Sequence, residues 1–164
     1  MSTNTSRKYR VVFDSNEIIA AGTSWLDPLF LINGPTSNDI VIARNTLITV
    51  SRHHTGLLCS KILAEYAEKL MDTGHSIDRI GRLFRDVLGT FVEINITTSA
   101  APTPPNDPDD EIFILCAIDG EADFLISEDK HLLAVKNAYV KPIIGNRSDI
   151  AVHLAPTGST ATQQ

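Results

Sequence analysis

The sequence predicts an α/β fold around a central, mainly parallel sheet. Short apolar runs rich in Val, Ile and Phe alternate along the chain with longer segments that have the hydrophobic period of a helix. This alternation is typical of repeated strand–helix–strand units, whose strands lie parallel. The 164 residues, 43% of them hydrophobic, are enough for one domain with a sizeable core but not for two.

Five segments have the composition of buried strands. They are short, rich in β-branched residues and separated by helical or turn-forming segments. In chain order they are RVVF (10–13), GLLCS (56–60), FVEIN (91–95), DFLIS (123–127) and KPIIG (141–145).

Two consecutive segments have the spacing of amphipathic helices. The apolar face of the first segment, 60–74, comprises Ile62, Leu63, Tyr66 and Leu70. Ser60 could cap its start and Gly74 its end. The second, 76–89, repeats the pattern with Ile77, Ile80, Leu83, Phe84, Val87 and Leu88. Segment 38–54 contains β-branched residues that favour a strand, but its length suits a helix better, and we interpret it as a helix.

The remaining segments set the limits of the domain. Residues 97–109 are predicted to form a Pro-rich loop. We expect a flexible N-terminus over residues 1–8, a folded domain over 9–150 and a disordered polar tail over 151–164.

Charge and composition limit the possible partners and the cellular location. The formal net charge of −6 and the pI near 5.2 exclude a surface that attracts nucleic acid everywhere, so a polyanionic partner would need a local basic patch or bound cations. The sequence has neither a signal-peptide core nor the ~18 consecutive apolar residues of a membrane span, and we expect a cytoplasmic protein. Cys59 and Cys116 lie in apolar runs and are expected to be buried free thiols.

Four carboxylates are predicted to meet at one edge of the sheet. Asp14 directly follows the first strand, and Asp129 follows the fourth after one intervening residue. Glu65 lies in the first turns of the helix after the second strand, and Asp110 opens the helix that follows the third strand and its loop. The carboxyl ends of parallel strands share one edge, and ligands collect in the crevice beyond it.

Each acid also has a simpler explanation. Asp14 could form a turn or cap a helix, and Asp129 could cap the helix that follows it. Glu65 could be an exposed helical residue paired with Lys61 or Lys69. Any one of these explanations is reasonable, but four such coincidences at one sheet edge are much harder to accept together.

Asp110 has competitors of its own. Asp107, Asp109 and Glu111 are close in the chain, and any acid there could favour the positive end of the helix dipole. The apolar stripe of this helix is formed by Phe113, Ile114, Ala117 and Ile118. Asp110 lies at the head of that stripe, so the helical phase predicts that its side chain turns inward.

The chemistry of such a cluster favours a metal ion. Crowded carboxylates repel one another, so some must be protonated or a cation must neutralise them. Hard oxygen ligands select Mg²⁺ or Mn²⁺ over zinc. Two such ions, roughly 3.5–4 Å apart, could activate a water molecule and stabilise the leaving oxygen of a phosphodiester. The sequence therefore predicts metal-assisted phosphodiester hydrolysis.

Three blocks of the sequence resemble the PIN domain family, in particular the VapC-like ribonuclease toxins of type II toxin–antitoxin systems. They are VVFDSNEIIAA (11–21), LLCSKILAEYAEKL (57–70) and DPDDEIFILCAIDGEADFLISEDKHLL (107–133). The resemblance extends over about residues 9–145. It places the family's catalytic and metal-binding acids on Asp14, Glu65, Asp110 and Asp129. It also aligns Asn16 and Ser127 with residues that support the first acid and the last one.

The resemblance carries further implications. It implies a three-layer α/β/α fold, dependence on Mg²⁺ or Mn²⁺ and endonucleolytic cleavage of RNA. It also implies a homodimer and inhibition by a cognate antitoxin protein. Asn16 would orient the Asp14 carboxylate from the following turn, although Asn at this place could also be a simple helix cap.

The chain also departs from the family pattern. Glu17 replaces an apolar residue, and we expect it to point to solvent rather than to act as an extra ligand. His131 stands where related sequences often carry another acid, which would weaken a second metal site. The Pro-rich loop could hold Asp110 less rigidly than a short loop would.

Substrate contacts are expected from the basic residues nearest to these acids. The candidates are Arg44, Arg52, Lys61, Lys130 and His131. Two other functions stay open at this point. One is a non-catalytic RNA-binding or regulatory module with the same fold. The other is a receiver-like or phosphatase-type domain, which the sequence favours less because the third strand leads into a Pro-rich loop rather than to a phosphoacceptor Asp.

Overall fold

The computed structural model describes residues 7–25 and 37–156. The expected flexible N-terminus lies outside the described residues from 1 to 6, and so does the expected tail from 157 to 164.

A five-stranded, entirely parallel sheet forms the centre of the molecule. The strand order is β3-β2-β1-β4-β5. The strands are β1 (Arg10–Phe13), β2 (Thr55–Leu58), β3 (Val92–Glu93), β4 (Phe124–Ile126) and β5 (Ile143–Gly145). All five lie inside, or within a residue of, the segments predicted from the sequence.

The chain crosses from strand to strand through helices. The helices of the described residues are α1 (Ser15–Thr23), α3 (Asn38–His53), α4 (Ser60–Asp72), α5 (Ile77–Asp86), α6 (Glu111–Asp119), α7 (Lys130–Ala134) and α8 (Arg147–Leu154). Single 3₁₀ turns are η1 (Leu88–Thr90), η2 (Pro108–Asp110) and η3 (Lys136–Ala138). The helical interpretation of segment 38–54 is confirmed by α3.

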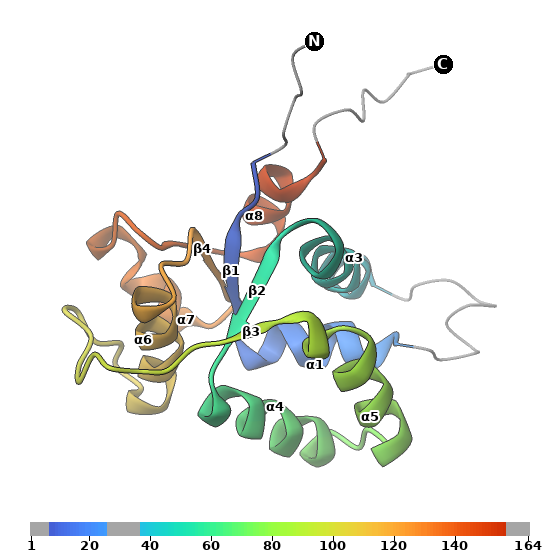
Figure 1. Ribbon diagram of the computed structural model, residues 1–164. Helices are drawn as coiled ribbons and strands as arrows, with labels where there is room; N and C mark the ends of the chain where they lie inside the picture. The colour runs from blue at the N-terminus through green and yellow to red at the C-terminus, as the bar shows by residue number, and fades with distance from the viewer. Residues whose placement is uncertain (1–6, 26–36, 157–164) are drawn as a thin grey trace, which may run out of the picture.

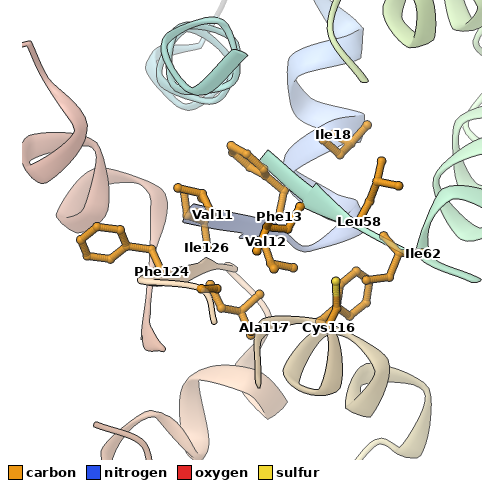
Figure 2. Close-up of a cluster of buried hydrophobic side chains, with 14 of the residues drawn as sticks. Val11, Val12, Phe13, Ile18, Leu58, Ile62, Cys116, Ala117, Phe124 and Ile126 are labelled. Carbon is orange, nitrogen blue, oxygen red and sulfur yellow. The ribbon is translucent and has the colours of Figure 1, made fainter. Parts of the chain in front are cut away.

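The helices cover both faces of the sheet and complete the expected three-layer α/β/α fold. Figure 1 shows α6 and α7 on one side of the strands and α1, α3 and α5 on the other. In Figure 2, Ile18 of α1 and Cys116 of α6 lie on opposite sides of β1. Val11 and Val12 of β1 are 0% exposed, as expected for a central strand covered on both faces.

The strand order contains a switch point between β1 and β4. The chain first builds outward from β1 through β2 to β3, and it then returns to pair β4 with the other side of β1. Crossover connections on the two sides of such a point diverge to opposite faces, which opens a crevice at the carboxyl ends of the two strands. Asp14 follows β1 and Asp129 follows β4, so both lie at this crevice.

Several details of the helices differ from the predictions. Cys59, not Ser60, is the N-cap of α4, so the predicted cap is displaced by one residue. Gly74 follows α4 with a φ of 83°, a left-handed conformation that glycine adopts without strain and that agrees with its predicted role at the helix end. Ile77, the first residue of α5, is 84% exposed, so it does not belong to the buried face predicted for this helix.

The predicted tail begins too early. Residues 151–154 continue α8, and Ile150 and Leu154 are buried, so the amphipathic turn containing them belongs to the domain. Cys59 and Cys116 are buried free thiols, as expected. Within the described part of the chain, no helix combines the length and the hydrophobicity that crossing a membrane requires.

Candidate active site

Asp14 is buried directly after β1, at the carboxyl end of that strand. It is the N-cap residue of α1, is 2% exposed, and its backbone N–H donates to Ile126 O of β4 at 2.9 Å. Ser127 Oγ donates to Asp14 Oδ2 at 2.7 Å. Burial raises the pKa of Asp14, and the hydrogen bond from Ser127 opposes that shift. Ser127 therefore orients the carboxylate and favours its charged form.

Ser127 also connects the first acid to the last. Its hydroxyl oxygen accepts a hydrogen bond from the Asp129 backbone N–H at 2.9 Å. One side chain thus fixes the Asp14 carboxylate and the turn that carries Asp129. Ser127 is 0% exposed, so this bridge is sealed from water.

Asp129 is the N-cap of α7. Its Oδ1 accepts from the His131 backbone N–H at 2.7 Å. The simpler explanation considered for this residue, a helix cap, is therefore realised in the structure. The cap does not remove Asp129 from the crevice, because its charge contributes to raising the pKa of both Asp14 and Asp110.

Asp110 is the acid whose carboxylate is least satisfied. It is 8% exposed, and its Oδ2 is buried with no hydrogen-bond partner. Burial raises the pKa of Asp110 to about 6, with further contributions from the carboxylates of Asp129 and Asp14. Its neighbour Asp109 is exposed, so the inward direction predicted from the helical phase is confirmed.

Glu65 reaches the crevice from α4. Ser15 Oγ donates to Glu65 Oε1 at 2.7 Å, and Lys69 Nζ lies 2.8 Å from the same oxygen. The side chain of Glu65 is 19% exposed. The sequence had suggested an ion pair with Lys61 or Lys69, and the structure selects Lys69. It did not reveal Ser15, although a hydroxyl residue directly after a strand-end acid is a position where such support could have been sought.

These side chains fit a divalent cation by their chemistry. Among the described residues, no three His, Cys, Asp or Glu side chains are close enough to chelate an ion as they stand. Asp14, Asp110 and Asp129 nevertheless interact electrostatically across one crevice, and Asp110 Oδ2 has no donor. A buried, unpartnered oxygen among repelling carboxylates is an arrangement that a hard cation would stabilise.

Asn16 is exposed, and none of the hydrogen bonds found among the described residues involves its side chain. In this structure Ser127, rather than Asn16, orients the Asp14 carboxylate.

Glu17 does not point to solvent, so that expectation was wrong. It is 2% exposed, and the Arg147 guanidinium binds both of its carboxylate oxygens at 2.9 and 3.0 Å. The Arg147 backbone N–H also donates to Glu128 Oε1 at 2.8 Å, and its guanidinium donates to Asp39 O at 3.2 Å. Arg147 thus ties α8 to α1, to α3 and to the turn between Ser127 and Asp129. No local pattern reveals a partner 130 residues away.

The five predicted basic residues fall into two groups. Arg44 and Arg52 line a separate cavity of about 380 Å³ together with Trp25, beyond the C-terminus of α1. That end is roughly 14 Å from Asp14, because a nine-residue helix rises 1.5 Å per residue. The structure therefore does not bring these two arginines to the acids.

Lys61, Lys130 and His131 belong to the edge of the sheet that carries the acids. Lys130 and His131 begin α7 directly after Asp129. Lys61 lines two cavities, one of about 430 Å³ that includes Glu65 and one of about 490 Å³ that includes Asn95. Because it borders both, Lys61 is well placed for a ligand that extends past Glu65.

The Pro-rich loop before Asp110 is tied to the domain at several points. Asp119 accepts from the backbone N–H groups of Thr97 and Thr98 at 2.6 and 2.9 Å. Further on, Glu111 accepts from Ala101 N at 2.8 Å, and Tyr139 OH donates to Thr103 O at 2.6 Å. These bonds anchor a segment that the sequence suggested would be loosely held.

Comparison with known proteins gives one result for this chain. A family model described as PIN domain matches residues 10–131, about three quarters of the sequence, and this range includes the positions of the four acids. No match was found among curated proteins or among solved structures.

Proposed function

Because the chain belongs to the PIN domain family, we propose that it is a metal-dependent endoribonuclease that hydrolyses RNA phosphodiester bonds. PIN domains are generally metal-dependent nucleases that bind RNA. The observation that carries the proposal for this chain is the buried crevice in which Asp14, Asp110 and Asp129 repel one another while Asp110 Oδ2 lacks a partner.

The four acids have complementary roles in this proposal. Asp14, Asp110 and Asp129 hold Mg²⁺ or Mn²⁺, and Glu65 borders the site from α4. When bound, the cation supplies a nucleophilic water and stabilises negative charge on the phosphodiester. Ser127 orients Asp14 and favours its charged form, and Ser15 orients Glu65 by a hydrogen bond to its Oε1.

Substrate contacts are proposed for the basic residues at the same edge. Lys61, Lys130 and His131 hold phosphates of the RNA strand, with Lys61 between the two cavities beside Glu65. With a net charge of −6, binding depends on these local cations and on the metal.

Glu17, which departs from the family pattern, made a non-catalytic module plausible. Both of its carboxylate oxygens are engaged by Arg147 in a buried ion pair, which favours the enzymatic proposal.

The decisive experiment is cleavage of single-stranded RNA by the purified protein. We expect cleavage with Mg²⁺ or Mn²⁺ and none in EDTA, and we expect Asp14→Asn to be inactive under both conditions. Cleavage that continues undiminished in EDTA, or that Asp14→Asn retains, would show contamination or a different mechanism.

We further propose that the protein is the VapC-like toxin of a toxin–antitoxin pair, acting in the cytoplasm as a homodimer. Expression alone should then slow growth, and a small cognate antitoxin should relieve the effect. Equal growth inhibition by the wild type and by Asp14→Asn would separate toxicity from catalysis and contradict the toxin proposal.

A further inference from the structure

Lys69 brings a positive charge into the acidic crevice. Its ammonium lies 2.8 Å from Glu65 Oε1 and also interacts favourably with the carboxylates of Asp14 and Asp110. Burial lowers the pKa of Lys69, but the three acids together raise it above its ordinary value. Lys69 therefore carries its charge at the site itself and not on a distant surface.

The helix dictates this placement. Lys69 follows Glu65 by four residues, so both side chains lie on the same face of α4, which directs them toward α1. Ser15 Oγ, from α1, donates to the same Glu65 oxygen at 2.7 Å. Glu65 Oε1 is thus held between a hydroxyl and an ammonium.

The other carboxylates also have engaged oxygens. Asp14 Oδ2 accepts from Ser127, and Asp129 Oδ1 accepts from His131 N. A carboxylate commonly bridges two metal ions by directing one oxygen to each ion. Asp14, Asp129 and Glu65 each have one oxygen that already contacts a protein donor, which disfavours this mode of bridging between two ions.

From this arrangement we propose that Lys69 supplies the positive charge on the Glu65 side of the crevice in place of a second metal ion. The protein would then bind one divalent cation, held by Asp14, Asp110 and Asp129. This inference rests on the proposed function, because it assumes the divalent cation of that mechanism. It goes further by stating the number of ions and by giving a role at the metal site to Lys69, which the sequence suggested only as a possible ion-pair partner of Glu65.

Electrostatic interactions favour Lys69 over a second metal ion beside Glu65. A second divalent ion at Glu65 would have to break the 2.8 Å ion pair or lie next to the ammonium, and like charges a few ångströms apart repel strongly in a partly desolvated site. With Lys69 in place, Glu65 is already neutralised. The first ion faces no such competition, because Asp110 Oδ2 has no donor to displace.

Metal stoichiometry tests the proposal without any measurement of cleavage. Calorimetric titration with Mn²⁺ should give one ion per chain for the wild type. Lys69→Met should give two ions, with the dipolar-coupled electron paramagnetic resonance spectrum of neighbouring Mn²⁺ ions. Lys69→Arg retains the charge and should return the count to one.

Lys61→Met is the matched control. It removes the same charge from the same helix, two turns closer to its N-terminus, and should leave the count at one. Circular dichroism establishes that each variant is folded before it is titrated.

The possible outcomes separate the two proposals. Two coupled ions in the wild type, or one ion in both the wild type and Lys69→Met, would overturn the role of Lys69 and leave the nuclease proposal intact. A wild type that binds no Mn²⁺ would overturn the metal-dependent nuclease itself and, with it, this inference.

Discussion

Asp109 and Asp110 are neighbours in the chain with opposite environments. Asp109 is exposed in the turn η2, whereas Asp110 is 8% exposed and faces the other acids. Asp110→Asn should abolish RNA cleavage because it removes a charge from the metal site. Asp109→Asn should keep most of the activity because Asp109 is exposed and lines the cavity beside Glu65 rather than the buried site of Asp14 and Asp110. Cleavage assays of both purified variants measure this difference, and the reverse ranking would mean that Asp109 is the ligand.

Ser127 is the uncharged side chain whose removal we expect to reduce metal affinity and cleavage rate. Ser127→Ala removes the hydrogen bond to Asp14 Oδ2 and the acceptor for Asp129 N. Loss of such support typically reduces metal affinity or activity about 10- to 100-fold, and we expect a loss in that range. Mn²⁺ titration and cleavage rates should fall together.

Ser148→Ala, on the exposed surface of α8, is the control for the loss of a hydroxyl and should behave as the wild type. Wild-type metal affinity in Ser127→Ala would show that packing alone positions Asp14.

The last helix, α8, is joined to the site by a buried ion pair. Arg147 contacts Glu17 of α1, Glu128 beside Asp129, and the carbonyl of Asp39 in α3. Burial raises the pKa of Glu17 and Arg147 opposes the shift, so the carboxylate depends on its partner to stay charged. The helix thus helps to fix the relative positions of α1 and of the turn that carries Asp129.

Removing one partner of this ion pair should destabilise the folded protein. Arg147→Met leaves a buried carboxylate without compensation, and such changes typically destabilise a protein by about 3–5 kcal/mol. Urea denaturation measures the loss. The double variant Glu17→Gln/Arg147→Met removes both charges and should recover part of it. A double variant no more stable than Arg147→Met would show that lost packing, and not the unpaired charge, causes the effect.

Acids from distant parts of the chain lie at one edge of the sheet, and their mutual repulsion affects the thermal stability of the entire domain. Without metal, the domain carries the mutual repulsion of its acids, which a bound cation removes. Asp129→Asn deletes one charge and retains an oxygen that can accept from His131 N. The metal-free variant should therefore melt at or above the wild-type temperature, and the increase on adding Mn²⁺ should shrink or vanish.

Thermal melts of both proteins, with and without Mn²⁺ at matched ionic strength, test both signs of this prediction. An increase with Mn²⁺ equal to that of the wild type would place Asp129 outside the metal site. A lower melting temperature of the metal-free variant would mean that the helix cap matters more than the repulsion.

Much of the fold follows from local pattern. The strands β1, β2 and β4 are short and densely apolar because both of their faces are buried, and this makes them readable in a single sequence, whereas the edge strands β3 and β5 are partly exposed. The direction of Asp110 could also be predicted, since it depends only on helical phase. Helix ends were predicted less well. Ile77 was expected to be buried but is exposed, and residues 151–154 were expected to lie in the tail but belong to α8. Whether a terminal turn is buried depends on whether another element covers it.

The sequence by itself determined the parallel sheet and the edge at which the acids lie, because residue period is a local property and the alternation of strands with helices implies parallel strands. Only the tertiary structure decided the partners of those acids. Ser15 and Glu65 are 50 residues apart, Ser127 and Asp14 are 113 apart, and Arg147 and Glu17 are 130 apart. Such pairs depend on how layers stack and on which strand occupies the switch point. The same stacking directs Glu17 into the core, separates Arg44 and Arg52 from the acids, and places Lys69, whose pairing with Glu65 is local, near Asp14 and Asp110.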